Sequence, residues 1–275
     1  MNSTINGRGI RRRAALAAVF LGLVAAARLA PLSAQSQPRN TAKAKVAAVS
    51  PPKEQPMPFH PGETLNYRVS WSAFSSAASL QLAAPERRNL FGWQTWHFRG
   101  EAHTLNTVRS LFSIDDQFDS YTDAATLESR QFEQHLNEMG KSKNDVQRLA
   151  ANGQPARAPA PLVMVLPGTR DVLGALYALR GVDWQRTPEV RAPVYDGRNV
   201  FDMHAARETA DDPVKVPAGT YSASRVAVRV FQNEKEVSAI HVVIWIASDA
   251  PRTPVQLQAD LPFGSLRAEL TSALQ

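Results

Sequence analysis

Three residues in the first half of the sequence have side chains that bind zinc. His97, Glu101 and His103 alternate along one expected strand and would share a face, and two imidazoles with a carboxylate are a zinc ligand set. Residues six apart on a flat strand, however, lie about 20 Å from each other, so one ion cannot reach both histidines. The pattern therefore predicts a solvated strand face rather than a metal site.

A second group consists of closely spaced aspartates: Asp115, Asp116, Asp119 and Asp123. A calcium loop needs oxygen ligands at alternating positions, a glycine near its centre and a glutamate at about the twelfth position. Counted from Asp115, neither the glycine nor the glutamate is in place. The stretch is more typical of turns and strand edges.

The spacings that mark common catalytic and cofactor sites are absent from the sequence. It contains no Gly-x-Ser-x-Gly, no His-Glu-x-x-His and no phosphate-binding glycine loop. The six histidines are scattered. We therefore assign no catalytic, metal or cofactor-binding residue and expect no cofactor, and an enzyme is a disfavoured interpretation.

Aromatic and cationic side chains near one expected helix are the remaining candidates for a site. Tyr177, Arg180 and Trp184 lie on or just after this helix, and Trp71 ends the first expected strand. Such groups can line a cleft that binds a ligand. In the structural alternative, Tyr177 packs on a sheet and Arg180 complements the negative C-terminal end of the helix.

The helix itself is predicted over residues 169–181. Thr169 is a good N-cap residue, and Val172, Leu176 and Leu179 recur at the spacing of one helical face. Gly181 follows as a stop signal.

Alternating apolar and polar residues predict β-strands over most of the remaining chain. The expected strands cover 64–71, 75–83, 93–104, 114–121, 128–137, 140–150, 225–230, 241–247, 255–261 and 266–270. The segment 128–137 also fits a helix, because Phe132 and Leu136 are four positions apart. The run 241–247 is apolar at consecutive positions, which suggests a strand covered on both faces. Roughly ten strands with one helix predict a mainly β fold: a curved antiparallel sheet or partial β-barrel with one inserted α-helix on its concave side.

The N-terminus has the features of a secretory signal. Arg8 and residues 11–13 form a positive region without acids, and an apolar stretch from Ala14 to Ala27 follows. A helix of that length spans roughly 21 Å, too short for a hydrocarbon core of about 30 Å. We expect cleavage near Ala34, by either the general or the twin-arginine export route.

Residues 35–58 are rich in Pro, Ala and Lys and predict a disordered leader, and 59–275 then form a single β-rich domain. The formal net charge of +6 arises at the N-terminus, because residues 1–34 carry five arginines without an acid and 35–57 carry a net +3. The remainder is slightly acidic, so no nucleic-acid partner is expected. With zero cysteines, we expect neither disulfides nor an N-terminal lipid anchor.

Several motifs in order along the chain resemble one uncharacterised envelope family, domain of unknown function 3108. The stretch 59–67 resembles its opening, 175–180 its helix, 216–221 a later turn and 264–266 its end. Small residues at 75–78 depart from the family, which often has a glycine there. The resemblance implies a periplasmic β-rich domain and supplies no activity.

These observations predict a periplasmic or secreted protein without a membrane span once the signal is removed. Its most favoured role is a non-enzymatic binding module for an apolar small molecule or lipid. An envelope interaction or assembly protein that contacts another envelope protein is the alternative, and a hydrolase acting on cell-wall material is less favoured. A cavity lined by Trp71, Trp96 or Trp245 would favour binding, whereas a packed core would favour assembly.

Overall fold

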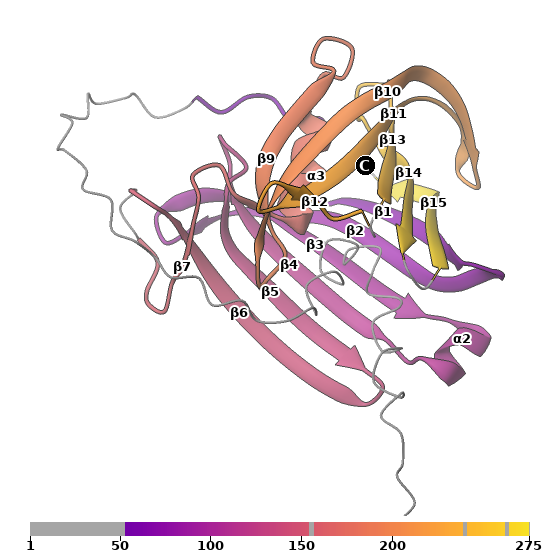
Figure 1. The fold of residues 1–275 in the computed structure, drawn as a ribbon, viewed down its shortest axis with the longest axis horizontal. Coiled ribbons are helices and arrows are strands. Elements are labelled where there is room, and N and C mark those ends of the chain that lie inside the picture. The colour runs from indigo at the N-terminus through magenta and orange to yellow at the C-terminus, as the bar shows by residue number, and fades with distance from the viewer. Residues whose placement is uncertain (1–52, 154–156, 239–240, 262–263, 275) are drawn as a thin grey trace, which may run out of the picture.

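The computed structural model describes residues 53–153, 157–238, 241–261 and 264–274. The expected signal peptide, its cleavage point at Ala34 and most of the expected leader lie outside these residues. The described part contains fifteen strands and two helices (Figure 1).

The strands and helices follow one another along the chain as β1 (Glu63–Trp71), β2 (Phe74–Leu90), β3 (Trp93–Thr104), α2 (Asn106–Leu111), β4 (Asp115–Asp123), β5 (Ser129–Glu138), β6 (Lys141–Ala151), β7 (Val163–Val165), β8 (Arg170–Asp171), α3 (Val172–Gly181), β9 (Glu189–Tyr195), β10 (Val200–Val216), β11 (Gly219–Gln232), β12 (Lys235–Glu236), β13 (His241–Ala247), β14 (Pro254–Leu261) and β15 (Gly264–Leu274). All strands belong to one sheet, in the order β7-β6-β5-β4-β3-β2-β1-β15-β14-β13-β11-β10-β9-β8, with β12 beside β11.

The sheet is antiparallel except at its two ends, where β7 runs parallel to β6 and β8 parallel to β9. In Figure 1 the N-terminal strands β2 to β6 form a broad surface, and the orange and yellow strands β10 to β15 rise from it and curl over. Helix α3 lies between these two halves. The structure thus confirms the predicted mainly β fold, a curved antiparallel sheet with an inserted helix.

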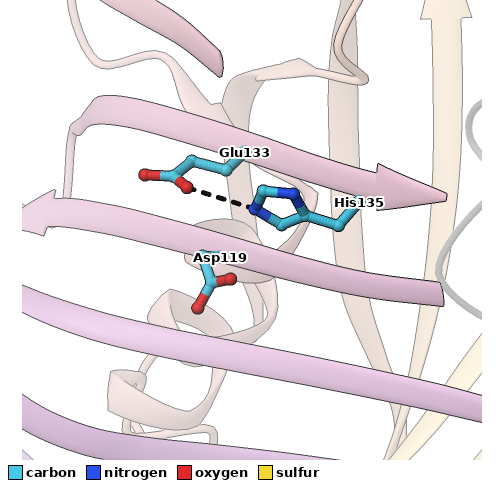
Figure 2. Close-up of side chains that lie close together, drawn as sticks. All are labelled: Asp119, Glu133 and His135. Atoms are coloured by element: carbon cyan, nitrogen blue, oxygen red, sulfur yellow. Dashed lines mark hydrogen bonds and ion pairs between the residues drawn. The ribbon is translucent and has the colours of Figure 1, made fainter. Parts of the chain in front are cut away.

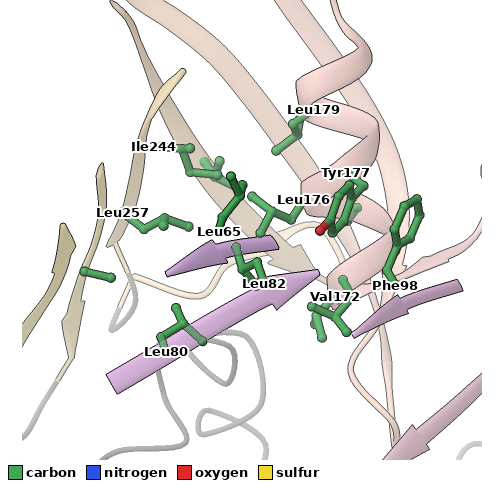
Figure 3. Close-up of a cluster of buried hydrophobic side chains, with 14 of the residues drawn as sticks. Leu65, Leu80, Leu82, Phe98, Val172, Leu176, Tyr177, Leu179, Ile244 and Leu257 are labelled. Atoms are coloured by element: carbon green, nitrogen blue, oxygen red, sulfur yellow. The ribbon is translucent and has the colours of Figure 1, made fainter. Parts of the chain in front are cut away.

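The inner face of the sheet is apolar because side chains alternate along each strand. On β1, Leu65, Tyr67 and Val69 are buried, while Arg68 between them is exposed. The same core includes Ile244 of β13 and residues of β14 and β15, the two strands that lie between β1 and β13 in the sheet. Figure 3 shows side chains from α3 pointing toward this shared core.

Side-chain contacts join the two ends of the strand order. The turn after β9 places the carbonyl oxygen of Asp196 3.3 Å from Gln134 Nε2 on β5, and that of Gly197 2.8 Å from Gln147 Nε2 on β6. Gly197 has φ of +93°, and a Cβ there would lie 2.3 Å from Gln134 Nε2. The positive φ therefore favours a glycine in the turn that contacts β5 and β6.

Helix α3 begins later than the sequence predicts. Asp171, not Thr169, is the N-cap, and its carboxylate accepts a hydrogen bond from the Gly174 backbone N–H at 2.9 Å. Thr169 instead donates its hydroxyl to the Leu166 carbonyl. At the other end, Gly181 is the last helical residue and lacks the positive φ of a glycine stop, because the extended Val182 ends the helix.

Other elements escaped prediction. Strands β9 and β10 contain Pro193 and the acidic pair before Pro213, residue types that are depleted in strands. The two-turn helix α2 is too short to show a period. None of the three elements follows the local sequence pattern of its type, so each depends on contacts with the rest of the fold.

Two predictions of burial need correction. Strand β13 is not covered on both faces: Ile244 and Ile246 are buried, but Val243 and Trp245 on the other face are half-buried. Arg225 of the neighbouring strand lies over the Trp245 ring at 5.6 Å, so a side chain rather than a second layer provides the cover. Trp71, which lies on the apolar face of the first expected strand, is also only half-buried, at the end of β1.

Candidate functional site

Arg180 on the last turn of α3 forms a buried ion pair with Glu63. Its two terminal nitrogens donate to the two carboxylate oxygens at 2.5 and 3.0 Å, and both side chains are 1% exposed. The guanidinium also donates to the carbonyls of Pro251 and Arg252 at 3.0 and 3.2 Å. Burial opposes the charge, but the hydrogen bonds that Arg180 donates to the Glu63 carboxylate raise the pKa of Arg180 above its ordinary value. This pair ties β1, α3 and the turn after β13 together.

The pairing changes how the end of the helix is capped. The sequence suggested Arg180 for that role, whereas Trp184 Nε1 donates to the Leu179 carbonyl at 2.9 Å and Arg252 donates to the Gly181 carbonyl at 2.9 Å. Trp184 is 4% exposed. The Gly181 carbonyl at the helix end thereby gains a donor, and the Leu179 carbonyl, which also accepts from the Val182 N–H, gains a second one.

Tyr177 belongs to a buried aromatic cluster beside Arg180. Its ring stacks on Phe98 with centroids 3.8 Å apart and meets Phe59 edge-on at 5.2 Å, and Figure 3 shows the Tyr177 and Phe98 rings side by side. Phe59 also packs on Trp96 at 5.0 Å. Within the described residues, the Tyr177 hydroxyl and the Trp96 indole N–H are buried without a hydrogen-bond partner. Burial raises the pKa of Tyr177 above its usual range.

Trp71 lies apart from the other three predicted ligand-binding residues. It is eight positions along β1 from Glu63, about 26 Å on an extended strand. There it stacks with Phe74 and meets Phe112 edge-on, at 6.1 and 6.0 Å. The structure therefore brings Tyr177, Arg180 and Trp184 together at α3 and leaves Trp71 at the opposite end of the strand.

The two histidines considered for zinc have separate partners, but the predicted solvated strand face is wrong at His97, which is 5% exposed because Asp119 and Tyr121 of the neighbouring strand cover it. His97 Nε2 lies 2.6 Å from Asp119 Oδ1, and His103 Nδ1 lies 3.0 Å from Asp115 Oδ1. The aspartates considered for calcium are likewise apart. Asp123 accepts backbone N–H groups in its own turn, and Asp116 points into the interior with 1% exposure.

The outer face of β4 and β5 carries a compact polar cluster that the sequence did not reveal (Figure 2). Asp119, Glu133 and His135 each offer one ligand atom, and these atoms lie within 4.8 Å of one another. Asp119 is directly opposite Glu133 in the strand register, and His135 is two positions further along β5 on the same face. His135 Nε2 lies 3.3 Å from Glu133 Oε2, the dashed line in Figure 2.

Asp119 is held in its charged form. Although burial opposes ionisation, hydrogen bonds from His97, Gln117 and Arg99 lower the pKa of Asp119 to about 2. The Arg99 Nε–Oδ1 distance is 2.8 Å. The carboxylate is therefore a fixed negative charge at any physiological pH.

Three carboxyl groups on the inner side behave in the opposite way. Burial raises the pKa of Asp116 to about 6, and burial also raises the pKa values of Asp171 and Asp196. Asp171 accepts hydrogen bonds from the hydroxyls of Ser120 and Ser129, both at 2.5 Å. The second oxygens of Asp116 and Asp196 are buried without a partner in the described part of the chain.

Sequence reasoning missed both clusters because each needs long-range pairing. Glu63 was not singled out in the sequence, and its partner is 117 positions away. The outer cluster combines a residue from the acidic run with two from a segment whose strand assignment was ambiguous. The period-two alternation of Glu133 and His135 was the one signal available.

Comparison with known proteins identifies a family and a fold. The family model "Protein of unknown function (DUF3108)" matches residues 66–271, and no curated protein matches the sequence. A β-barrel-like protein of the domain of unknown function DUF1849 from Brucella abortus superposes with a TM-score of 0.51 at 11% identity, over 77% of this chain and 96% of that one.

Two more distant structures also align. A candidate lipoprotein from Parabacteroides distasonis gives a TM-score of 0.37 at 10% identity, over 79% of this chain and 97% of that one. A candidate exported protein with a YmcC-like fold from Bacteroides fragilis gives 0.34 at 12% identity, over 80% and 98%. Among the described helices, neither is long and apolar enough to cross a bilayer.

Proposed function

This chain belongs to the DUF3108 family, and from that premise we propose that it is an exported, non-enzymatic binding module for an apolar or lipid-like ligand. The ligand would lie on the concave side of the sheet beside α3. Export rests on the arginine-rich, then apolar N-terminus.

The observation that carries the proposal is the size of the curved sheet. An eight-stranded barrel is about as wide as its own inward side chains can fill, and larger sheets enclose more space. Here fifteen strands form one curved sheet, and α3 is the described helix that enters its concave side. The facing surface is apolar from Leu65 on β1 to Val228 on β11.

The aromatic cluster supports a ligand with a polar atom at one end. The Tyr177 hydroxyl and the Trp96 indole N–H are buried without partners in the described residues. Buried Tyr and Trp groups usually find a hydrogen-bond partner. A lipid-like ligand, apolar in its body and polar at its head, would satisfy such groups, whereas a purely aliphatic one would not.

Native mass spectrometry of the full chain, purified from its own periplasm without detergent, tests the proposal. We expect a co-purifying apolar species and saturable uptake of an apolar fluorescent probe. Val228→Phe, which adds a ring on the inner face, should reduce uptake; Ala227→Phe adds the same ring to the other face and should not. Absence of both a bound species and probe uptake would refute the proposal.

One observation favours envelope assembly as the second candidate. Strand β6 pairs with β7 only at 149–151, so within the described residues its edge is open over Lys141 to Arg148. Val146 on this strand and Met139 before it are 45% and 53% exposed. Lysines at positions 141 and 143 are typical of edges protected from self-pairing. Cross-linking in intact cells through position 146 would reveal a partner strand if this role is correct.

A further inference from the structure

Asp119, Glu133 and His135 on the outer face of β4 and β5 have the composition and spacing of a metal site. We propose that they bind one divalent transition-metal ion, for which Zn²⁺ is the best match. Imidazole favours zinc over calcium and magnesium, which prefer all-oxygen sites, and two carboxylates with one imidazole are accepted zinc ligands. This site is independent of the apolar interior.

The three side chains start from a rigid and well-spaced scaffold. Asp119 and Glu133 are direct cross-strand neighbours, and the pair Gln117 and His135 is next in register. Side chains directly opposite on antiparallel strands have Cβ atoms about 5 Å apart. Ligand atoms already within 4.8 Å therefore need only rotamer changes to close on one ion. Three protein ligands leave a fourth position for water.

The contacts of His135 place its Nε2 directly beside a carboxylate oxygen. Its Nδ1 lies 3.1 Å from Asn144 Oδ1 and its Nε2 lies 3.3 Å from Glu133 Oε2. A neutral imidazole carries one proton and can donate to only one of these two oxygens. If Nδ1–H donates to Asn144, the free Nε2 lone pair faces a carboxylate. A proton at Nε2 relieves that contact in the absence of metal, and a metal ion can take the place of the proton and bind both Nε2 and the carboxylate oxygen.

Surrounding residues orient the ligands, as they do in established metal sites. Gln131 donates to Glu133 Oε1 at 2.6 Å, and Gln117 donates to Asp119 Oδ2 at 2.5 Å. On the other Asp119 oxygen lie His97 Nε2 and Arg99 Nε. Each carboxylate oxygen has two lone pairs, so Oδ2 of Asp119 and both oxygens of Glu133 can still bind a cation.

Arg99 limits the strength of the site. Its guanidinium offsets one of the two carboxylate charges, so with a neutral imidazole the three ligands and Arg99 carry a net charge of about −1. The Arg99 side chain is 36% exposed and can move outward, whereas Asp119 is 3% exposed and fixed. Removing Arg99 should therefore strengthen binding of the ion, which a merely structural cluster would not predict.

Isothermal titration with ZnCl₂ of the full, untagged chain, previously stripped with a chelator, tests the site. We expect one ion per chain, with affinity reduced by about tenfold or more in His135→Ala and Glu133→Gln, and increased in Arg99→Gln. The matched control is His204→Ala. It removes an exposed His–Asp contact of 2.8 Å on β10, and among the described residues this pair has no third possible metal ligand beside it.

Circular dichroism melting without metal shows that each variant is folded before titration. A wild-type chain that shows no saturable zinc binding would overturn the proposal. So would a His135→Ala chain that binds like wild type, or a His204→Ala chain that loses binding equally.

Discussion

The ionisable residues inside the curved sheet and those on its outer face are used in opposite ways. On the inner side, Glu63 and Arg180 are 1% exposed, and the Arg180 guanidinium donates four hydrogen bonds within the chain. On the outer side, the side chains of Glu133 and His135 are 18% and 35% exposed and retain free acceptors. The inner pair is satisfied within the chain, whereas Glu133 and His135 on the outer face remain partly open to solvent.

The sharpest way to break this comparison is the same substitution on each face. Glu63→Gln leaves the Arg180 charge buried without its counter-ion, which should lower the free energy of unfolding by about 3–5 kcal/mol. Glu133→Gln removes a partly exposed charge and should change it by less than about 1 kcal/mol. Urea unfolding at pH 7 measures both.

Equal losses in the two variants would show that the outer cluster is as structural as the inner pair. A double variant, Glu63→Leu with Arg180→Met, provides a further check. Replacing both charges by apolar groups should recover much of the stability lost in Glu63→Gln, because no unpaired charge remains.

The contribution of core packing by helix α3 can be measured apart from that of the charge pair. Leu176 is buried on the face that points toward the sheet (Figure 3). Leu176→Ala should destabilise the protein by about 2–5 kcal/mol, depending on how far the site collapses. Leu111 on α2 is 54% exposed, and Leu111→Ala should have little effect. A Leu176→Ala loss under about 1 kcal/mol would mean that the helix does not close the core.

Local sequence patterns predicted the strands that have one apolar and one polar face. They did not predict which strands or side chains pair across long distances in the sequence. The alternation in β1 and the period of α3 were sufficient to predict a curved sheet with a helix. In contrast, β10 pairs with β11 from Asp202 to Val216, with two register shifts, despite poor local propensity. The candidate sites show the same limit, since Arg180 was identified but its partner Glu63 was not. Charge pairs leave no periodic trace in a sequence.

Two neighbouring aspartates on β4 have pKa values shifted in opposite directions, and they offer a test with a smaller expected effect on stability. Burial raises the pKa of Asp116 to about 6, above its unfolded value of about 4, so this residue's contribution to stability is present at low pH and is lost as pH rises through 6. Asp116→Asn keeps a side-chain oxygen for the Asn137 N–H. It should therefore stabilise the protein at pH 7.5 by about 2 kcal/mol and have little effect at pH 4.

Asp115, the next residue, is the matched control. Hydrogen bonds from Arg109 are the main cause that lowers the pKa of Asp115 to about 2, so its contribution is present at neutral pH and is lost as pH falls from about 4 to 2. Asp115→Asn should therefore weaken the protein slightly at pH 7.5. Thermal unfolding of both variants across pH 3–8 measures these effects. If the change in melting temperature relative to wild type varied with pH in the same way for both variants, this account would be contradicted.

The smallest expected effect on stability distinguishes a ligand site from a packed core. The Tyr177 hydroxyl is buried without a partner in the described chain, so Tyr177→Phe removes an unsatisfied polar atom while keeping the ring stacked on Phe98. The free energy of unfolding should change by less than about 1 kcal/mol, because no hydrogen bond is lost. If a lipid-like ligand uses that hydroxyl, the affinity for a probe with a polar head should fall, while the affinity for a purely aliphatic probe should stay the same. Phe98→Leu, which removes the stacked ring, should weaken both probes and the fold together. A Tyr177→Phe chain that binds both probes like wild type would remove Tyr177 from the proposed site and leave it a role in packing alone.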